Sequence, residues 1–268
     1  MINTNSASPE NTYRVLLVDD SASNIAVGKI LLQRIGCDVS IAKNGEEAVQ
    51  VASNDRFDLI LMDISMPVMN GLTATQLLRD HEGPNQLTPV VGVTAHTLES
   101  DRRDCLNAGM NDFLPKPITK DALTQIIEQW ILKTNEPSNV VHMESVTQAS
   151  PVLDETLLAR LRNDLGDEGF TISINIFLDE LKKRNNTLER LNKEGDATGL
   201  GKEGHAIKSS AGTFGCPQLA NDGKKLEIAG KANDLAECQS TLKPLSVSLS
   251  AAQQHLQSYL KRMGVAHA

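Results

Sequence analysis

The 268 residues of this chain suit two modest domains better than one, because a domain typically takes about 100–200 residues. The formal net charge is −8, and roughly −6 of it lies before residue 135, which argues against nucleic acid as a general partner because phosphate backbones require basic patches. The four cysteines form no C-x-x-C pair, which indicates reduced, partly buried thiols and argues against a disulfide framework or a zinc site.

The N-terminus is polar and lacks the pattern of a targeting segment. Residues 1–12 are rich in Asn, Ser and Thr and lack the apolar core of a signal peptide. No apolar run approaches the ~18 residues that a membrane span needs. We therefore expect a soluble, cytoplasmic protein that contacts no membrane, with a disordered lead-in over residues 1–12.

Short apolar runs alternate with amphipathic segments from residue 13 to residue 134. The runs predict strands at residues 15–18, 39–41, 59–62, 90–93 and 113–114. Helices are expected at residues 25–35, 45–52, 72–79 and 98–108, and a last one carries apolar residues at i, i+3, i+4, i+7 and i+8 over residues 123–131. Five such units in succession predict a doubly wound α/β domain with a five-stranded parallel sheet. Its ligand site should lie at the carboxyl ends of the strands.

A second, all-α domain is expected over residues 152–264, after a linker at 135–151 that is rich in Pro, Ser, Asn, Thr and Gln. Helices are predicted at 153–165 and 170–191, with Asp154 as the N-cap of the first. A glycine-rich break at residues 195–204 should precede a helix through 205–214, and another helix spans 219–229. A last apolar stripe, 235–260, is interrupted by Pro244, which favours a kinked helix of a four-helix bundle.

Acidic side chains follow two of the predicted strands. Asp19 and Asp20 follow the first strand and Asp63 the third, so that all three meet at one edge of the sheet. Carboxylates packed this closely repel one another and invite a hard divalent cation such as Mg²⁺, with Mn²⁺ as an alternative. Thr94 and Lys116 end at the same edge. Together with the metal they would grip the oxygens of a phosphoryl group while a carboxylate attacks in line.

This first segment resembles the response regulator receiver domain, a flavodoxin-like fold, over roughly 120 residues. The resemblance implies that Asp63 is the phosphoacceptor. It implies that Asp19, Asp20, Asp63 and the backbone carbonyl of Ser65 bind the metal. Thr94 and Phe113 would be the switch residues and Lys116 the phosphate-binding cation, with Pro117 in the place of a proline whose peptide bond is often cis. The segments that carry the resemblance are Val15-Leu-Leu-Val-Asp-Asp20, Leu61-Met-Asp-Ile-Ser-Met-Pro-Val-Met-Asn-Gly71, Val93-Thr-Ala95 and Phe113-Leu-Pro-Lys-Pro117.

One face of a predicted helix in the second domain carries a histidine with a cation and small residues. His205, Lys208, Ser209 and Gly212 lie at i, i+3, i+4 and i+7. This face offers a nucleophilic imidazole, a charge for an incoming phosphoryl group and open space, and we expect it to face solvent. The opposite face, with Ile207, Ala211 and Phe214, should enter the bundle core.

The run resembles the histidine phosphotransfer (HPt) domain, whose pattern is H-x-x-K-G/S-S/A with a glycine ten positions after the histidine. The resemblance implies that His205 is a phosphoacceptor and that Lys208 assists it. Gly215 holds the place of the later glycine, and Ser209 stands where many members have glycine, which should narrow access to His205 slightly.

The two resemblances predict a phosphorelay intermediate of a two-component system. A phosphoryl group would reach Asp63 from the phosphohistidine of an upstream sensor histidine kinase, move to His205, and leave to the aspartate of a downstream response regulator. No ATP-binding kinase signature or P-loop is evident, so we expect Mg²⁺-dependent phosphotransfer and self-dephosphorylation only. The polar lead-in favours a separate protein over the tail of a hybrid kinase, as a monomer or weak dimer.

Two alternatives use the same residues. In a phosphate sink, His205 would hand the phosphoryl group back to Asp63, where it is hydrolysed. In a binding module, phosphorylated Asp63 would only change how the helical domain docks a partner. The residues alone do not separate these directions, nor transfer within one chain from transfer between two.

Overall fold

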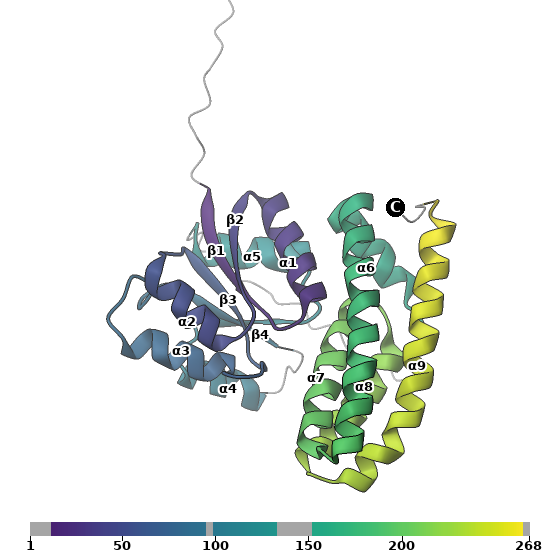
Figure 1. The fold of residues 1–268 in the computed structure, drawn as a ribbon. Coiled ribbons are helices and arrows are strands. Elements are labelled where there is room, and N and C mark those ends of the chain that lie inside the picture. The colour runs from purple at the N-terminus through teal and green to yellow at the C-terminus, as the bar shows by residue number, and fades with distance from the viewer. Residues whose placement is uncertain (1–11, 95–98, 133–151, 265–268) are drawn as a thin grey trace, which may run out of the picture.

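A computed structural model describes residues 12–94, 99–132 and 152–264. The predicted lead-in, apart from Thr12, and the predicted linker at 135–151 lie outside the described residues. The described residues form an α/β domain and a helical domain that lie side by side (Figure 1).

The α/β domain has a parallel sheet with the strand order β2-β1-β3-β4-β5. This confirms the predicted five-stranded doubly wound sheet. All the strand ends that carry acidic residues therefore meet at one edge. The strands are β1 (Tyr13–Val18), β2 (Cys37–Ala42), β3 (Leu59–Asp63), β4 (Val90–Thr94) and β5 (Asp112–Pro115).

Helices cover both faces of this sheet (Figure 1). Alternate strand residues point to opposite faces: Leu17 and Leu61 pack towards α1 and α5, whereas Leu16 and Ile60 pack towards α2, α3 and α4. Burial on both faces explains why the strands are continuous apolar runs. The helices are α1 (Ala22–Ile35), α2 (Gly45–Asn54), α3 (Gly71–Asp80), α4 (Glu99–Asn107) and α5 (Lys120–Trp130).

The second domain is helical, as predicted. Its elements are α6 (Glu155–Glu194), α7 (Ala197–Thr213), α8 (Pro217–Lys231) and α9 (Leu235–Arg262). Helix α6 is interrupted at Gly166, whose φ of 70° and ψ of 167° are not helical, and this matches the predicted division between two helices. Helix α9 continues through Pro244. In the core, the rings of Phe177 and Phe214 stack with centroids 4.5 Å apart.

The predicted glycine-rich break at residues 195–204 is confirmed only at Gly195, the left-handed C-cap of α6, and is wrong for the later glycines. Helix α7 begins at Ala197, and the side chain of its N-cap Asp196 accepts a hydrogen bond from the backbone N–H of Gly199. The glycines inside α7 permit a close approach to α8, because a Cβ on Gly201 would lie only 2.7 Å from the Cα of Gly230. The glycines inside α7 therefore serve helix packing and do not end that helix.

Two expectations from composition concern the described residues. The four cysteines are buried and form no disulfide. Within the described ranges, no helix combines the length and the apolar character that crossing a membrane requires.

Candidate functional site

Three carboxylates gather at the carboxyl edge of the sheet. Asp19 and Asp20 follow β1, and Asp63 is the last residue of β3. One oxygen of each lies within 4.8 Å of the others, with Asp19 and Asp63 buried and Asp20 half-buried. The sequence prediction that these three side chains come together is therefore met by the geometry.

An ammonium group lies between two of these carboxylates. Lys116 Nζ is 2.7 Å from Asp19 Oδ2 and 2.7 Å from Asp63 Oδ2. Burial alone would lower the pKa of Lys116, but the two carboxylates raise it above its usual value, so the group stays charged. The Lys116–Pro117 peptide bond is cis.

The carboxylates carry more negative charge than Lys116 balances. Burial, together with the charge of Asp19, raises the pKa of Asp20 to about 6. Burial also raises the pKa of Asp63 to about 6, against the opposing effect of Lys116. If all three carboxylates are ionised, two negative charges remain beside one ammonium, in a set of oxygen donors that hard divalent cations prefer. The residues therefore fit a divalent metal ion.

The remaining residues predicted for this site lie around it. Thr94 is buried at the end of β4, and its carbonyl oxygen accepts a hydrogen bond of 2.7 Å from the backbone N–H of Lys116. The backbone N–H of exposed Ser65 donates to Asp63 Oδ1 at 3.2 Å. Phe113 is half-buried, with the guanidinium of Arg102 lying 5.6 Å from its ring centroid. Their roles as switch and ligand residues remain predictions.

His205 is held by a buried glutamate of the neighbouring helix α8. Glu227 Oε1 lies 2.9 Å from His205 Nδ1, and Lys208 Nζ and Lys231 Nζ each lie 2.6 Å from the same carboxylate. Burial alone would raise the pKa of Glu227, but these hydrogen bonds hold it well below its usual range. Because the carboxylate can only accept, His205 donates from Nδ1, and in the neutral imidazole the lone pair is then on Nε2.

The helix faces of α7 are as predicted, but the surroundings of His205 are not. Ile207, Ala211 and Phe214 are fully buried in the bundle. The side chain of His205 is only 16% exposed, and Ser209 is buried. Part of the expected solvent-facing surface instead contacts the α/β domain, because Ser209 Oγ accepts hydrogen bonds from Asn24 Nδ2 and Lys116 Nζ.

The two candidate sites adjoin one another. Lys116 Nζ donates a hydrogen bond of 3.1 Å to Ser209 Oγ of α7. A cavity of about 650 Å³ is lined by Asp20 and Ser65 from the α/β domain and by His205 and Glu227 from the bundle. Residues beside the buried Asp63, namely Asp20 and Ser65, therefore face the same space as His205.

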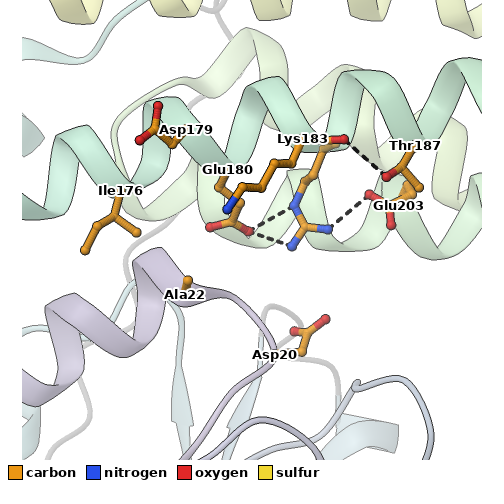
Figure 2. A pocket seen from close by; sticks show the side chains of 9 residues that line it. Asp20, Ala22, Ile176, Asp179, Glu180, Lys183, Thr187 and Glu203 are labelled. Carbon is orange, nitrogen blue, oxygen red and sulfur yellow. Dashed lines mark hydrogen bonds and ion pairs between the residues drawn. The ribbon is translucent and has the colours of Figure 1, made fainter.

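A smaller cavity of about 370 Å³ lies along the same domain boundary, between α6 and the start of α1 (Figure 2). Glu180 of α6 points towards the first turn of α1, above Ala22. Arg184 forms ion pairs with both glutamates: its Nη2 lies 2.6 Å from Glu180 Oε1, and its Nη1 lies 3.1 Å from Glu203 Oε2. The sequence did not predict a role in the site for Glu180, Arg184 or Glu227. Only the i, i+4 spacing of Glu180 and Arg184 gave a signal, and that spacing is common on exposed helices.

We expect Glu227→Gln to slow phosphorylation of His205 by about 10–100-fold, because the neutral amide no longer balances the positive charge that forms on the imidazole. Its rate should be measured beside Glu189→Gln, an exposed glutamate of α6 that serves as the matched control. Equal rates in the two variants would show that Glu227 does not act on His205.

The same substitution should change stability with pH. The pKa of Glu227 is lower in the folded chain than its usual 4.5, so its ion pairs stabilise the fold above pH 4.5 and lose this effect as the pH falls below it. Denaturation of Glu227→Gln should therefore show a loss of about 1–3 kcal/mol at pH 7. The loss should shrink in acid, and a loss that is independent of pH would contradict the charge argument.

Comparison with known proteins gives two family matches in tandem. A family model described as response regulator receiver domain matches residues 15–128, and one described as Hpt domain matches residues 173–263. The chain is 32% identical over 220 residues to the aerobic respiration control sensor protein ArcB of Escherichia coli O157:H7, over 82% of this chain and 28% of ArcB. It is 28% identical over 236 residues to the sensor histidine kinase GacS of Pseudomonas protegens, over 84% of this chain and 26% of GacS.

A receiver domain is among the solved structures that are similar to this chain. The receiver domain of a sensor histidine kinase from Pseudomonas aeruginosa PAO1, solved with a magnesium ion coordinated in its active site cleft, is 38% identical, with a TM-score of 0.42, over 45% of this chain and 98% of that one. This chain spans about 28% of the length of the first curated relatives.

Proposed function

Because this chain joins a response regulator receiver domain to an Hpt domain, we propose that it is a phosphorelay intermediate. Asp63 accepts a phosphoryl group from the phosphohistidine of a sensor histidine kinase. His205 then takes the group over and passes it to the aspartate of a downstream response regulator. We assign residues 13–134 to the receiver domain, 135–151 to a linker and 152–264 to the Hpt domain, after a lead-in at 1–12. The chain acts in the cytoplasm as a monomer or weak dimer.

The first step rests on the charges around Asp63. Its carboxylate attacks phosphorus in line, while Lys116 and Thr94 bind the phosphoryl oxygens. Asp19, Asp20, Asp63 and the carbonyl of Ser65 would hold Mg²⁺, or Mn²⁺ in its place, and the bound ion would neutralise charge on the transferring group. Phe113 changes its rotamer together with Thr94 as the switch.

The second step rests on His205. Its Nε2 attacks the phosphorus of the acyl phosphate, and the positive charge that develops on the imidazole faces Glu227. Lys208, held 2.6 Å from Glu227, lies on the same helix face and assists with the incoming charge.

The observation that carries this proposal is the shared cavity, lined by Asp20 and Ser65 on one side and by His205 on the other. A phosphorylation-gated binding module has no need for such a space. The similarity to the sensor proteins ArcB and GacS also supports relay.

His205→Gln tests the second step. With a radiolabelled small acyl phosphate and Mg²⁺, we expect the variant to keep the alkali-labile acyl phosphate on Asp63 and to lose the alkali-stable label of a phosphohistidine. The matched control is His255→Gln, which changes an exposed histidine of α9 and should label like the wild type. Alkali-stable label that persists in His205→Gln would exclude His205 as the acceptor.

A further inference from the structure

The two domains pack against each other through apolar side chains. A Cβ on Gly169 of α6 would lie 3.3 Å from Ile30 of α1, so the helices are in van der Waals contact there. Ile30 packs against a cluster of buried apolar residues that continues from the sheet into the bundle. Near the end of α1, Arg34 Nη1 donates to the carbonyl oxygen of Asp164 at 3.1 Å.

A buried asparagine links α1 to the helix that carries His205. Asn24 is 6% exposed, and its Nδ2 donates to Ser209 Oγ at 3.2 Å. Its Oδ1 accepts a hydrogen bond of 3.0 Å from Thr213 Oγ1. The amide oxygen and nitrogen therefore both have partners on α7. Burying an amide is costly unless it is hydrogen-bonded, so these contacts favour the docked arrangement specifically.

A glutamate of the bundle lies at the N-terminus of α1. Glu180 Oε2 accepts hydrogen bonds from Ser23 Oγ at 2.7 Å, from the backbone N–H of Ser23 at 3.2 Å and from Ser21 Oγ at 3.1 Å. Arg184 donates two hydrogen bonds to the other carboxylate oxygen, Glu180 Oε1. An anion is favourable at this helix end, where backbone N–H groups lack partners within the helix.

These contacts bring the two acceptor residues close together. Lys116 Nζ is 2.7 Å from Asp63 Oδ2 and 3.1 Å from Ser209 Oγ. Ser209 is one helical turn after His205 on the same face, where side chains are about 5–6 Å apart. Lys116 therefore connects Asp63 to Ser209, and His205 lies one helical turn before Ser209, beside the common cavity.

We infer that the receiver domain of this same chain is the partner of His205, so that the phosphoryl group passes between Asp63 and His205 in cis. The inference rests on the proposed function. In the step, Nε2 forms the bond to phosphorus as the bond from phosphorus to the Asp63 carboxylate oxygen breaks. The electron pair of that bond returns to the carboxylate, and the proton stays on His205 Nδ1, facing Glu227.

Docking in cis also restricts outside partners. The side chain of Asp63 is 4% exposed and that of His205 is 16% exposed while the domains are in contact. A kinase must bring its phosphohistidine to Asp63, and a downstream regulator must bring its aspartate to His205. Both use surfaces that the docked domains cover, so the domains separate for each transfer to or from an outside partner. Tethering favours their return, since a linked domain has an effective concentration of about a millimolar.

Dilution distinguishes transfer within a chain from transfer between chains. The chain is loaded with label from a small acyl phosphate, the donor is removed, and the conversion of alkali-labile to alkali-stable label is followed. We expect the first-order rate constant of the wild type to stay unchanged over a hundredfold dilution. A rate constant that falls in proportion to concentration would overturn transfer in cis.

Complementing variants give the second arm. A mixture of His205→Gln, which keeps Asp63, and Asp63→Asn, which keeps His205, can transfer only between chains. At micromolar concentration we expect this mixture to transfer about a hundredfold to a thousandfold more slowly than the wild type. Equal rates would overturn the inference and leave the proposed function intact, whereas no alkali-stable label in either sample would count against the proposed function itself.

An interface variant tests the docked surface. Ile30→Asp places a charge in the contact between α1 and α6, and Leu106→Asp is the matched control on exposed α4. We expect both to acquire label on Asp63 at the wild-type rate, and only Ile30→Asp to lose fast conversion to phosphohistidine, by at least tenfold. Fast conversion in Ile30→Asp would show that this docked surface is not used.

Discussion

Asp63→Asn is expected to abolish labelling of the chain by a small acyl phosphate, on both the aspartate and the histidine. The carboxylate is the nucleophile of the first step, and an amide oxygen does not replace it. Because His205 receives the group from Asp63, the loss should extend to the alkali-stable label.

Asp55→Asn is the matched control for this prediction. Asp55 is an exposed carboxylate paired with Arg14 at 3.0 Å, far less buried than Asp63. Its replacement should leave both labels at the wild-type level. If Asp63→Asn still acquired alkali-stable label at the wild-type rate, His205 would be taking the group directly from the donor, and the order of the relay would be wrong.

Lys116→Met should reduce the rate of Asp63 phosphorylation by about 10²–10³-fold. Lys116 lies 2.7 Å from Asp63 and is the ammonium group that meets the charge of the phosphoryl oxygens. Removing one such contact in a buried site typically costs this much. Lys120→Met, at the exposed start of α5, is the matched control and should react normally.

The stability of Lys116→Met should depend more strongly on a bound divalent cation than the stability of the wild type does. Without Lys116, the buried carboxylates of Asp19 and Asp63 lose their shared ion pair, which destabilises the fold by about 3–5 kcal/mol. A divalent cation that binds only the folded state offsets part of this loss. We therefore expect Mg²⁺ to raise the Tm of Lys116→Met by more than that of the wild type. An equal shift in both would argue against a metal ion beside Lys116.

The receiver site was predictable from the sequence because its geometry follows from topology. Parallel strands end at one edge, so Asp19, Asp63, Thr94 and Lys116 had to approach one another once the strands were identified. The helix face of His205 followed from spacing in the same way. Both predictions use local patterns and one general rule of sheet topology.

The domain contact was not predictable, because its residues carry no local signal. Asn24 and Ser209 are 185 residues apart and meet only when two finished domains dock. The same docking explains why His205 faces the receiver domain, where an exposed histidine was expected. The helix break predicted at Gly201 was wrong for a related reason. A glycine in the sequence indicates a possible helix end, and only the structure shows that Gly201 instead permits the close approach of α8.

The order of labelling tests the central claim most directly. In a rapid-quench time course of the wild-type chain with labelled acyl phosphate and Mg²⁺, alkali-labile label on Asp63 should appear first. Alkali-stable label on His205 should follow after a lag. Once the donor is removed, it should rise with the same rate constant as that with which the label on Asp63 declines. Alkali-stable label that rises without a lag, or that rises equally in Asp63→Asn, would contradict relay through Asp63.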